Sequence, residues 1–141
     1  MRFALGARGF RRVWQRFGMP IASLRPWAPE HLFLLVEANT AAMTRYPGGP
    51  ENDDEVRRRH SRYLRLCADD AVCMFAIEAD GGSAGGIGFW PIEHDGAGSY
   101  ETGWNVLSRW QGHGIARQAL RALIHIVSER APHATPLLAY P

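Results

Sequence analysis

The spacing of apolar and polar residues predicts that short strands and helices alternate along the first part of the chain. Residues 21–25 are a short strand candidate that Pro26 ends. Pro29 suits the first turn of a helix, which the turn residues 46–50 would end. The apolar face expected for this helix consists of Leu32, Leu35, Val36 and Met43.

A second helix is predicted to begin near Asn52. Its first turn holds the acidic residues 53–55, and arginines follow, an order that matches the helix dipole. Its expected buried stripe consists of Val56, His60, Tyr63, Leu64 and Cys67. On this stripe we interpret His60 as a half-buried packing residue.

Three strands are predicted next, over residues 73–79, 84–90 and 100–107. Asp80-Gly81-Gly82 is a hairpin signal between the first two, whereas the polar residues 91–98 are expected to form a loop. Glycines in the second strand indicate a bulge or the close approach of another group. In the third strand Glu101, Gly103 and Asn105 share one face.

A glycine-containing segment, residues 111–117, joins the third strand to a long helix. The expected buried face of that helix consists of Ile115, Ala119, Leu120, Leu123, Ile126 and Val127, and the opposite face of Arg117, Arg121 and His125. Glycines between a strand and a helix let backbone N–H groups converge on an anion, to which the helix N-terminus adds partial positive charge. The segment is therefore a candidate seat for a phosphate or pyrophosphate.

Other phosphate-binding loops fit this segment poorly. A Walker loop needs a lysine, and the chain has none. A dinucleotide fingerprint needs a third glycine where Arg117 stands, and a kinase glycine loop lies between two strands. The plain alternative is a tight turn without a ligand.

Composition is that of one globular domain: 141 residues, 46% of them hydrophobic and 21% charged. No apolar run is long enough for a membrane helix. Cys67 and Cys73 match neither a disulfide scaffold nor a zinc pattern, and reduced thiols in a cytoplasmic protein are expected. Basic residues do not cluster on a folded face as a nucleic-acid footprint requires, so neither nucleic acid nor membrane is an expected partner.

The basic excess belongs to the first residues. Residues 1–18 contain five arginines and no acidic residue. They are either a targeting or membrane-surface segment or an over-extended start, with Met19 as the true initiator. We expect this leader to be disordered or outside the true start, and residues 19–141 to form the domain.

The glycine segment matches the pattern Q/R-x-x-G-x-G/A through Gln111, Gly114 and Ala116. It resembles the coenzyme A loop of the GNAT superfamily of N-acetyltransferases, and the likeness extends over residues 19–141. The resemblance implies an α/β fold with a mixed, mostly antiparallel sheet flanked by helices. It implies that Val106 lies beside the pantetheine arm, where departure of the next strand opens a cleft. The residues implied to hold the pyrophosphate are Gln111, Gly112, His113, Gly114, Ile115, Ala116 and Arg117.

The resemblance further implies direct transfer of an acetyl group from acetyl-coenzyme A to a primary amine of a small molecule or protein, without a metal. Glu101 stands where a carboxylate base is found in similar enzymes; the alternative is that it only hydrogen-bonds a neighbouring strand or loop. His94 is a weaker candidate base, and His113 is expected beside the phosphates. Trp90 and the turn at residues 46–50 either line the amine site or pack.

In the family a further helix and two strands normally follow the part that this chain covers, and they carry an asparagine and a tyrosine acid; Tyr140 is not assigned to that role. The domain is therefore expected to be incomplete at its C-terminus: a shortened enzyme, a chain covered by a partner, or a decayed copy. A non-catalytic acyl-coenzyme A binding or interaction module is the rival function. The chain could also form a homodimer.

Overall fold

The computed structural model describes residues 18, 20–44, 48–66, 73–130 and 135–140. They contain one five-stranded sheet whose strands lie side by side in the order of the sequence. The strands are β1 (Ala22–Pro26), β2 (Cys73–Ala79), β3 (Gly82–His94), β4 (Ala97–Val106) and β5 (Leu137–Ala139). The first four are antiparallel to their neighbours, and β5 runs parallel to β4. The mixed, mostly antiparallel sheet expected from the sequence is confirmed.

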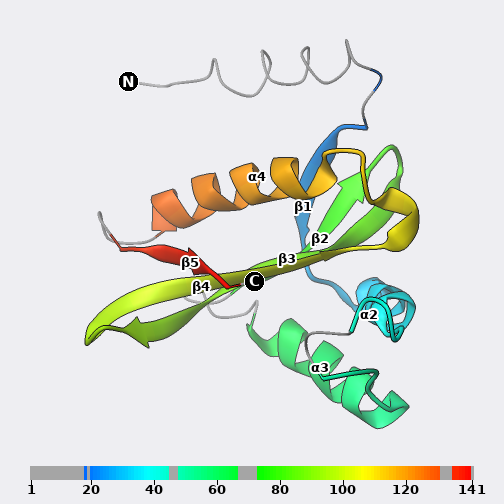
Figure 1. Ribbon diagram of the computed structural model, residues 1–141, viewed down its shortest axis with the longest axis horizontal. Helices are drawn as coiled ribbons and strands as arrows, with labels where there is room; N and C mark the ends of the chain where they lie inside the picture. Colours follow the sequence, from blue (N-terminus) through cyan, green and yellow to red (C-terminus); the bar gives the residue numbers. More distant parts are fainter. Residues whose placement is uncertain (1–17, 19, 45–47, 67–72, 131–134, 141) are drawn as a thin grey trace.

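Helices cover the sheet from both sides (Figure 1). Helix α4 (Ile115–Arg130) lies along one face. The short 3-10 helix η1 (Pro29–His31) leads into α2 (Leu32–Ala38), which lies with α3 (Asp53–Leu66) on the other face. The structure therefore has three layers, with a hydrophobic cluster on each side of the sheet.

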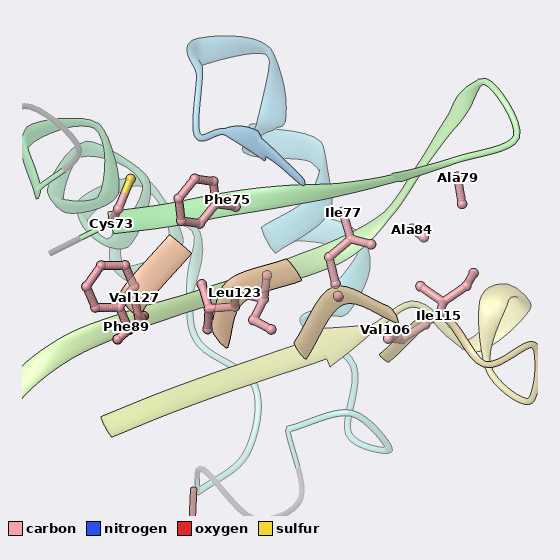
Figure 2. Packing of buried hydrophobic residues seen from close by; sticks show 12 residues of the cluster. Cys73, Phe75, Ile77, Ala79, Ala84, Phe89, Val106, Ile115, Leu123 and Val127 are labelled. Carbon is pink, nitrogen blue, oxygen red and sulfur yellow. The ribbon is translucent and has the colours of Figure 1, made fainter. Parts of the chain in front are cut away.

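The larger cluster lies between the sheet and α4. Figure 2 shows its side chains, which come from β2, β3, β4 and α4 and meet in one layer. Ile115, Ala119, Leu123 and Val127 of α4 are buried, and Leu120 and Ile126 pack beside them, which confirms the predicted face of this helix. Arg117, Arg121 and His125 are exposed on the opposite side, as predicted.

The predicted helix after Asn52 is confirmed as α3. Asn52 and Glu55 form a reciprocal cap: the Glu55 N–H donates to Asn52 Oδ1 over 3.0 Å, and the Asn52 N–H donates to Glu55 Oε2 over 2.8 Å. This pairing satisfies N–H groups that a helix start leaves open. His60 is half-buried, as predicted, and its Nδ1 accepts a hydrogen bond from Trp27 Nε1 over 3.0 Å. Cys67, which was expected on the same stripe, lies outside the described residues.

The polar loop predicted for residues 91–98 is wrong. β3 continues to His94 and β4 begins at Ala97, so a tight turn at Asp95 and Gly96, both with positive φ, joins them. Pro91 has no backbone N–H to donate to a neighbouring strand. It is tolerated in β3 because the described part of β2 pairs with β3 only as far as Phe89. Outside the core this hairpin has no apolar alternation to signal its strands, which is why the pattern suggested a loop.

The first predicted helix is shorter than expected. α2 ends at Ala38 because the side chain of Asn39 bonds the backbone of Glu51 twice, over 2.7 and 2.8 Å. Leu34 and Leu35 are buried, whereas Val36, predicted to be buried, is 59% exposed. With only seven residues in the helix, the leucine pair sets its buried side and turns Val36 to solvent.

The side chain of Gln118, on α4, attaches β1 to that helix. It is 4% exposed; its Oε1 accepts from the Ala22 N–H and its Nε2 donates to the Pro20 carbonyl, each over 2.9 Å. A buried amide whose donor and acceptor are both used stabilises the contact between elements far apart in sequence.

Candidate functional site

The segment between β4 and α4 turns at two glycines in the left-handed conformation. After the 3-10 helix η2 (Ser108–Trp110), φ is +77° at Gly112 and +74° at Gly114. Such values favour glycine, because a side chain there would crowd the backbone. The first backbone N–H groups of α4, which follow, have no partner within the helix and can serve an anion. The predicted sequence of strand, glycine loop and helix is confirmed.

Two side chains of this loop bind the protein's own backbone. Gln111 Nε2 donates to the Val106 carbonyl at the end of β4 over 2.8 Å. His113 Nδ1 lies 3.2 Å from the Trp110 carbonyl, and its side chain is exposed. The structure thus brings Gln111 and Val106 together, and the Val106 side chain is buried in the core. Any ligand of Val106 would therefore meet its backbone.

Among the described residues, β5 is the outer neighbour of β4 over three residue pairs. β5 pairs with it only at residues 100–102, where the Tyr100 N–H donates to the Pro136 carbonyl over 2.8 Å. Alternate residues of a strand present their backbone groups to the same side. Trp104 and Val106 therefore face the same side as Tyr100, beyond the described pairing with β5. The cleft that the resemblance implied at this end of β4 stays a prediction.

A cavity of about 430 Å³ lies at this end of β4. Residues of β4 line it, together with residues of the loop, the start of α4 and the segment after α2. Its lining residues are Ala42, Met43, Trp104, Asn105, Val106, Ser108, Gln111 and Ala116. The cavity thus reaches from the glycine loop along the last residues of β4.

A second cavity, of about 240 Å³, lies on the face of the sheet that α2 and α3 cover. It shares Trp104 and Asn105 with the first, so the two adjoin at the end of β4. Gly86 and Gly103 lie in its floor, and Trp90 is one of its walls. Trp90 lines this cavity and also packs against the hydrophobic cluster on this face of the sheet. That it lines the amine site stays a prediction, and the turn at residues 46–50 is described only from Gly48 onward.

Glu101 lies on β4, half-buried, on the same sheet face as Gly103 and Asn105. Its Oε2 accepts a hydrogen bond from Trp90 Nε1 over 3.0 Å. The second candidate base, His94, lies at the end of β3 and is exposed, with its Nδ1 3.3 Å from the Tyr140 hydroxyl. Four residues of strand, or roughly 13 Å, separate His94 from Trp90. The structure brings Glu101 and Trp90 together and leaves His94 apart.

Sequence reasoning missed an ion pair between the two sides of the site. Arg109 of η2 pairs with Glu37 of α2, and so joins the segment before the glycine loop to the helix above the second cavity. The two residues are 72 positions apart, and each is a charged residue on an exposed surface. No spacing rule in the sequence relates them.

Comparison with known families identifies this fold. The acetyltransferase (GNAT) domain family matches residues 23–140. The chain belongs to the GNAT acetyltransferase family. A comparison with curated proteins finds no match.

Solved structures of GNAT proteins share the fold. The Salmonella typhimurium acetyltransferase that modifies the N-terminal serine of ribosomal protein L7/L12 superposes with a TM-score of 0.65 at 24% identity, over 79% of this chain and 66% of that one. A predicted acetyltransferase from Clostridium acetobutylicum, solved with acetyl-CoA, gives 0.62 at 14% identity over 85% and 80%. Glucosamine-6-phosphate N-acetyltransferase from Arabidopsis thaliana gives 0.57 at 14% over 85% and 82%. The chain thus spans slightly less than two thirds of the length of the Salmonella enzyme.

Within the described ranges no group of three or more His, Cys, Asp or Glu side chains could hold a metal ion. Among the same residues no helix is both long and apolar enough to cross a membrane.

Proposed function

We propose that this protein transfers an acetyl group from acetyl-coenzyme A directly to a primary amine. The observation that carries the proposal is the loop with two left-handed glycines between β4 and α4, beside a cavity of about 430 Å³ that this loop and the end of β4 line. The family match and the neighbours solved with coenzyme A or acetyl-coenzyme A support it. The buried thiol of Cys73 is consistent with a reducing compartment such as the cytoplasm.

The backbone of residues 111–117 would hold the pyrophosphate. The hydrogen bond from Gln111 Nε2 to the Val106 carbonyl holds the start of this loop against the end of β4. The acyl arm would follow the cavity of about 430 Å³ along β4, where the backbone of Trp104 and Val106 faces outward. The amine would approach from the adjoining cavity of about 240 Å³ on the other side.

Glu101 would act as the base in this scheme. It takes a proton from the ammonium group through a water, because it lies on the face of β4 that holds the second cavity but does not itself line that cavity. The neutral amine nitrogen then attacks the acetyl carbonyl carbon, and a C–N bond forms. The C–S bond breaks, and the coenzyme leaves as a thiolate with the electron pair. The nitrogen gives up its second proton, which passes through water to the thiolate, so that a neutral amide and a free thiol remain.

Calorimetric titration of acetyl-coenzyme A into the full chain tests the coenzyme site, and release of free thiol with a panel of amines tests the transfer. Saturable binding with amine-dependent thiol release supports the proposal. Binding without release by any amine would favour the rival, a non-catalytic acyl-coenzyme A binding module. No binding by a folded chain would overturn the assignment of the loop.

A further inference from the structure

The cavity of about 240 Å³ has glycine in its floor and aromatic rings in its walls. A Cβ on Gly103 would lie 3.0 Å from Cη2 of Trp90, and one on Gly86 would lie 3.5 Å from Cζ3 of Trp27. Both indole rings therefore lie directly over the bare backbone of the sheet. Tyr63 of α3 forms a further wall.

Hydrogen bonds and ring contacts hold these walls in place. Trp90 donates to Glu101 and Trp27 donates to His60, each over 3.0 Å. The Tyr63 ring meets Trp27 edge to face, with ring centroids 5.3 Å apart. Because these aromatic side chains are already held in place, binding a ligand costs little conformational entropy for ordering them.

Charge in the cavity is already balanced. Arg59 is the one charged residue among the described residues that line it, and its guanidinium pairs with Glu51 over 2.5 Å. Burial raises the pKa of Tyr63, while the charges of Arg59 and Arg62 oppose that rise; the hydroxyl stays neutral at physiological pH. The cavity therefore presents aromatic surface to a ligand. Its guanidinium group is already paired, and no acidic residue is among its described lining.

We propose that the acceptor is a small amine with a flat aromatic body and no second charged group, an inference that rests on the proposed acetyl transfer. Offset or edge-to-face contacts would hold such a body, and ring faces also attract an ammonium group. A polyamine would leave a second ammonium group without a carboxylate. A phosphorylated amino sugar would need a free cation, and Arg59 is already paired.

Binding of amines to the full chain tests this choice without requiring turnover. Ligand-observed NMR, with coenzyme A present, would compare tryptamine with spermidine and glucosamine 6-phosphate. We expect tryptamine to bind at least about tenfold more tightly than either comparator, because each comparator brings a further charged group for which the cavity has no free partner. Equal or tighter binding of spermidine or glucosamine 6-phosphate would overturn the proposal.

Two glycine variants locate the bound amine. A methyl group on Gly86 meets its neighbours at 3.5 Å or more, so Gly86→Ala adds volume to the floor without a clash, whereas Gly98→Ala has no neighbour within 4 Å and lies outside the cavity. We expect Gly86→Ala to weaken tryptamine binding about tenfold and Gly98→Ala to leave it unchanged. Trp90→Phe, which removes ring area from the wall, should weaken it as well. Unchanged affinity in both Gly86→Ala and Trp90→Phe would exclude this cavity as the site.

These experiments distinguish failure of the acceptor assignment from failure of the proposed acetyl transfer. If tryptamine binds in this cavity but acetyl-coenzyme A and tryptamine release no thiol, the proposed transfer to this amine fails while the cavity assignment stands. If thiol is released with spermidine but not with tryptamine, the transfer stands and the assignment of the acceptor class fails.

Discussion

Trp90 and Glu101 face each other across β3 and β4 and are joined by a hydrogen bond of 3.0 Å from the indole nitrogen to the carboxylate. Trp90 is a wall of the proposed amine cavity, and Glu101, which we propose as the base, holds that wall in place through this bond. Two roles of Glu101, holding the ring and accepting a proton, can therefore be separated by substitution.

Glu101→Gln keeps an oxygen that can accept from Trp90 but removes the base. We expect kcat to fall at least about a hundredfold near neutral pH, with little change in the KM for the amine. Glu101→Ala, the matched control, removes both roles and should also raise the KM for the amine. Full kcat in Glu101→Gln would show that Glu101 only positions Trp90.

Gly112→Ala and Gly96→Ala separate backbone strain from ligand binding. Both glycines have positive φ, +77° and +75°, and neither has a neighbour within 4 Å of an added Cβ. Each substitution should destabilise the fold by about 1 kcal/mol, measured by urea denaturation. Only Gly112→Ala should lose coenzyme affinity, by at least about tenfold in calorimetry, because only Gly112 lies in the proposed loop. Equal affinities for the two variants would place the coenzyme elsewhere.

The ion pair between Glu37 and Arg109 is half-exposed, so its contribution to stability should be small. We expect Arg109→Ala to lower the free energy of unfolding by less than about 1 kcal/mol, and about 1 M salt to remove most of that difference. The charge-reversed double variant, Glu37→Arg with Arg109→Glu, should recover what either single reversal loses. A thermodynamic cycle in urea denaturation measures this coupling; a coupling of zero would mean that the pair does not join α2 to η2 in solution.

His60 should make stability depend on pH on the acidic side of neutrality. Burial, and then the proximity of His31, lowers the pKa of His60 below its ordinary value of 6.5. As the pH falls below 6.5 the unfolded chain takes up this proton first, so the free energy of unfolding decreases. Above 6.5 the residue is neutral in both states, and the effect vanishes.

His60→Gln tests this origin, because glutamine offers Trp27 an acceptor but does not titrate. Urea denaturation of both proteins at several values between pH 5 and pH 7.5, roughly spanning the titration of histidine, gives two slopes. We expect the slope of the variant to be shallower. Identical slopes would assign the acid dependence to other groups.

The sequence predicted those parts of the fold that depend on local chemistry. The helix start near Asn52, the turn at Asp80 to Gly82 and the glycines before α4 each depend on a few residues, and each is found where it was expected. The buried face of α4 was correct because a helix of 16 residues repeats its pattern several times. α2, with seven residues, repeats it barely twice, and there Val36 was misplaced.

The contacts of the site depend on register, which the sequence did not reveal. The hydrogen bond between Trp90 and Glu101 exists because residues 85–94 pair in order with residues 106–97. The sequence predicted a loop at residues 91–98, and a loop of that length does not define this register. Likewise, Gly103 shared a face with Glu101 as predicted, but that a ring lies over it follows only from the cross-strand arrangement. Sequence therefore located the loop and the strand, and tertiary structure supplied the cavity.

The order of the sheet bears on how this chain folds. Each of the first four strands pairs with the strand that follows it, so these pairings can form progressively as the chain emerges from the ribosome. The bonds from Gln118 to Pro20 and Ala22 span 98 and 96 residues and can close only after α4 exists. We therefore expect the β3–β4 hairpin to gain protection from hydrogen exchange early in folding, and the Ala22 N–H, which donates to Gln118, to gain it last.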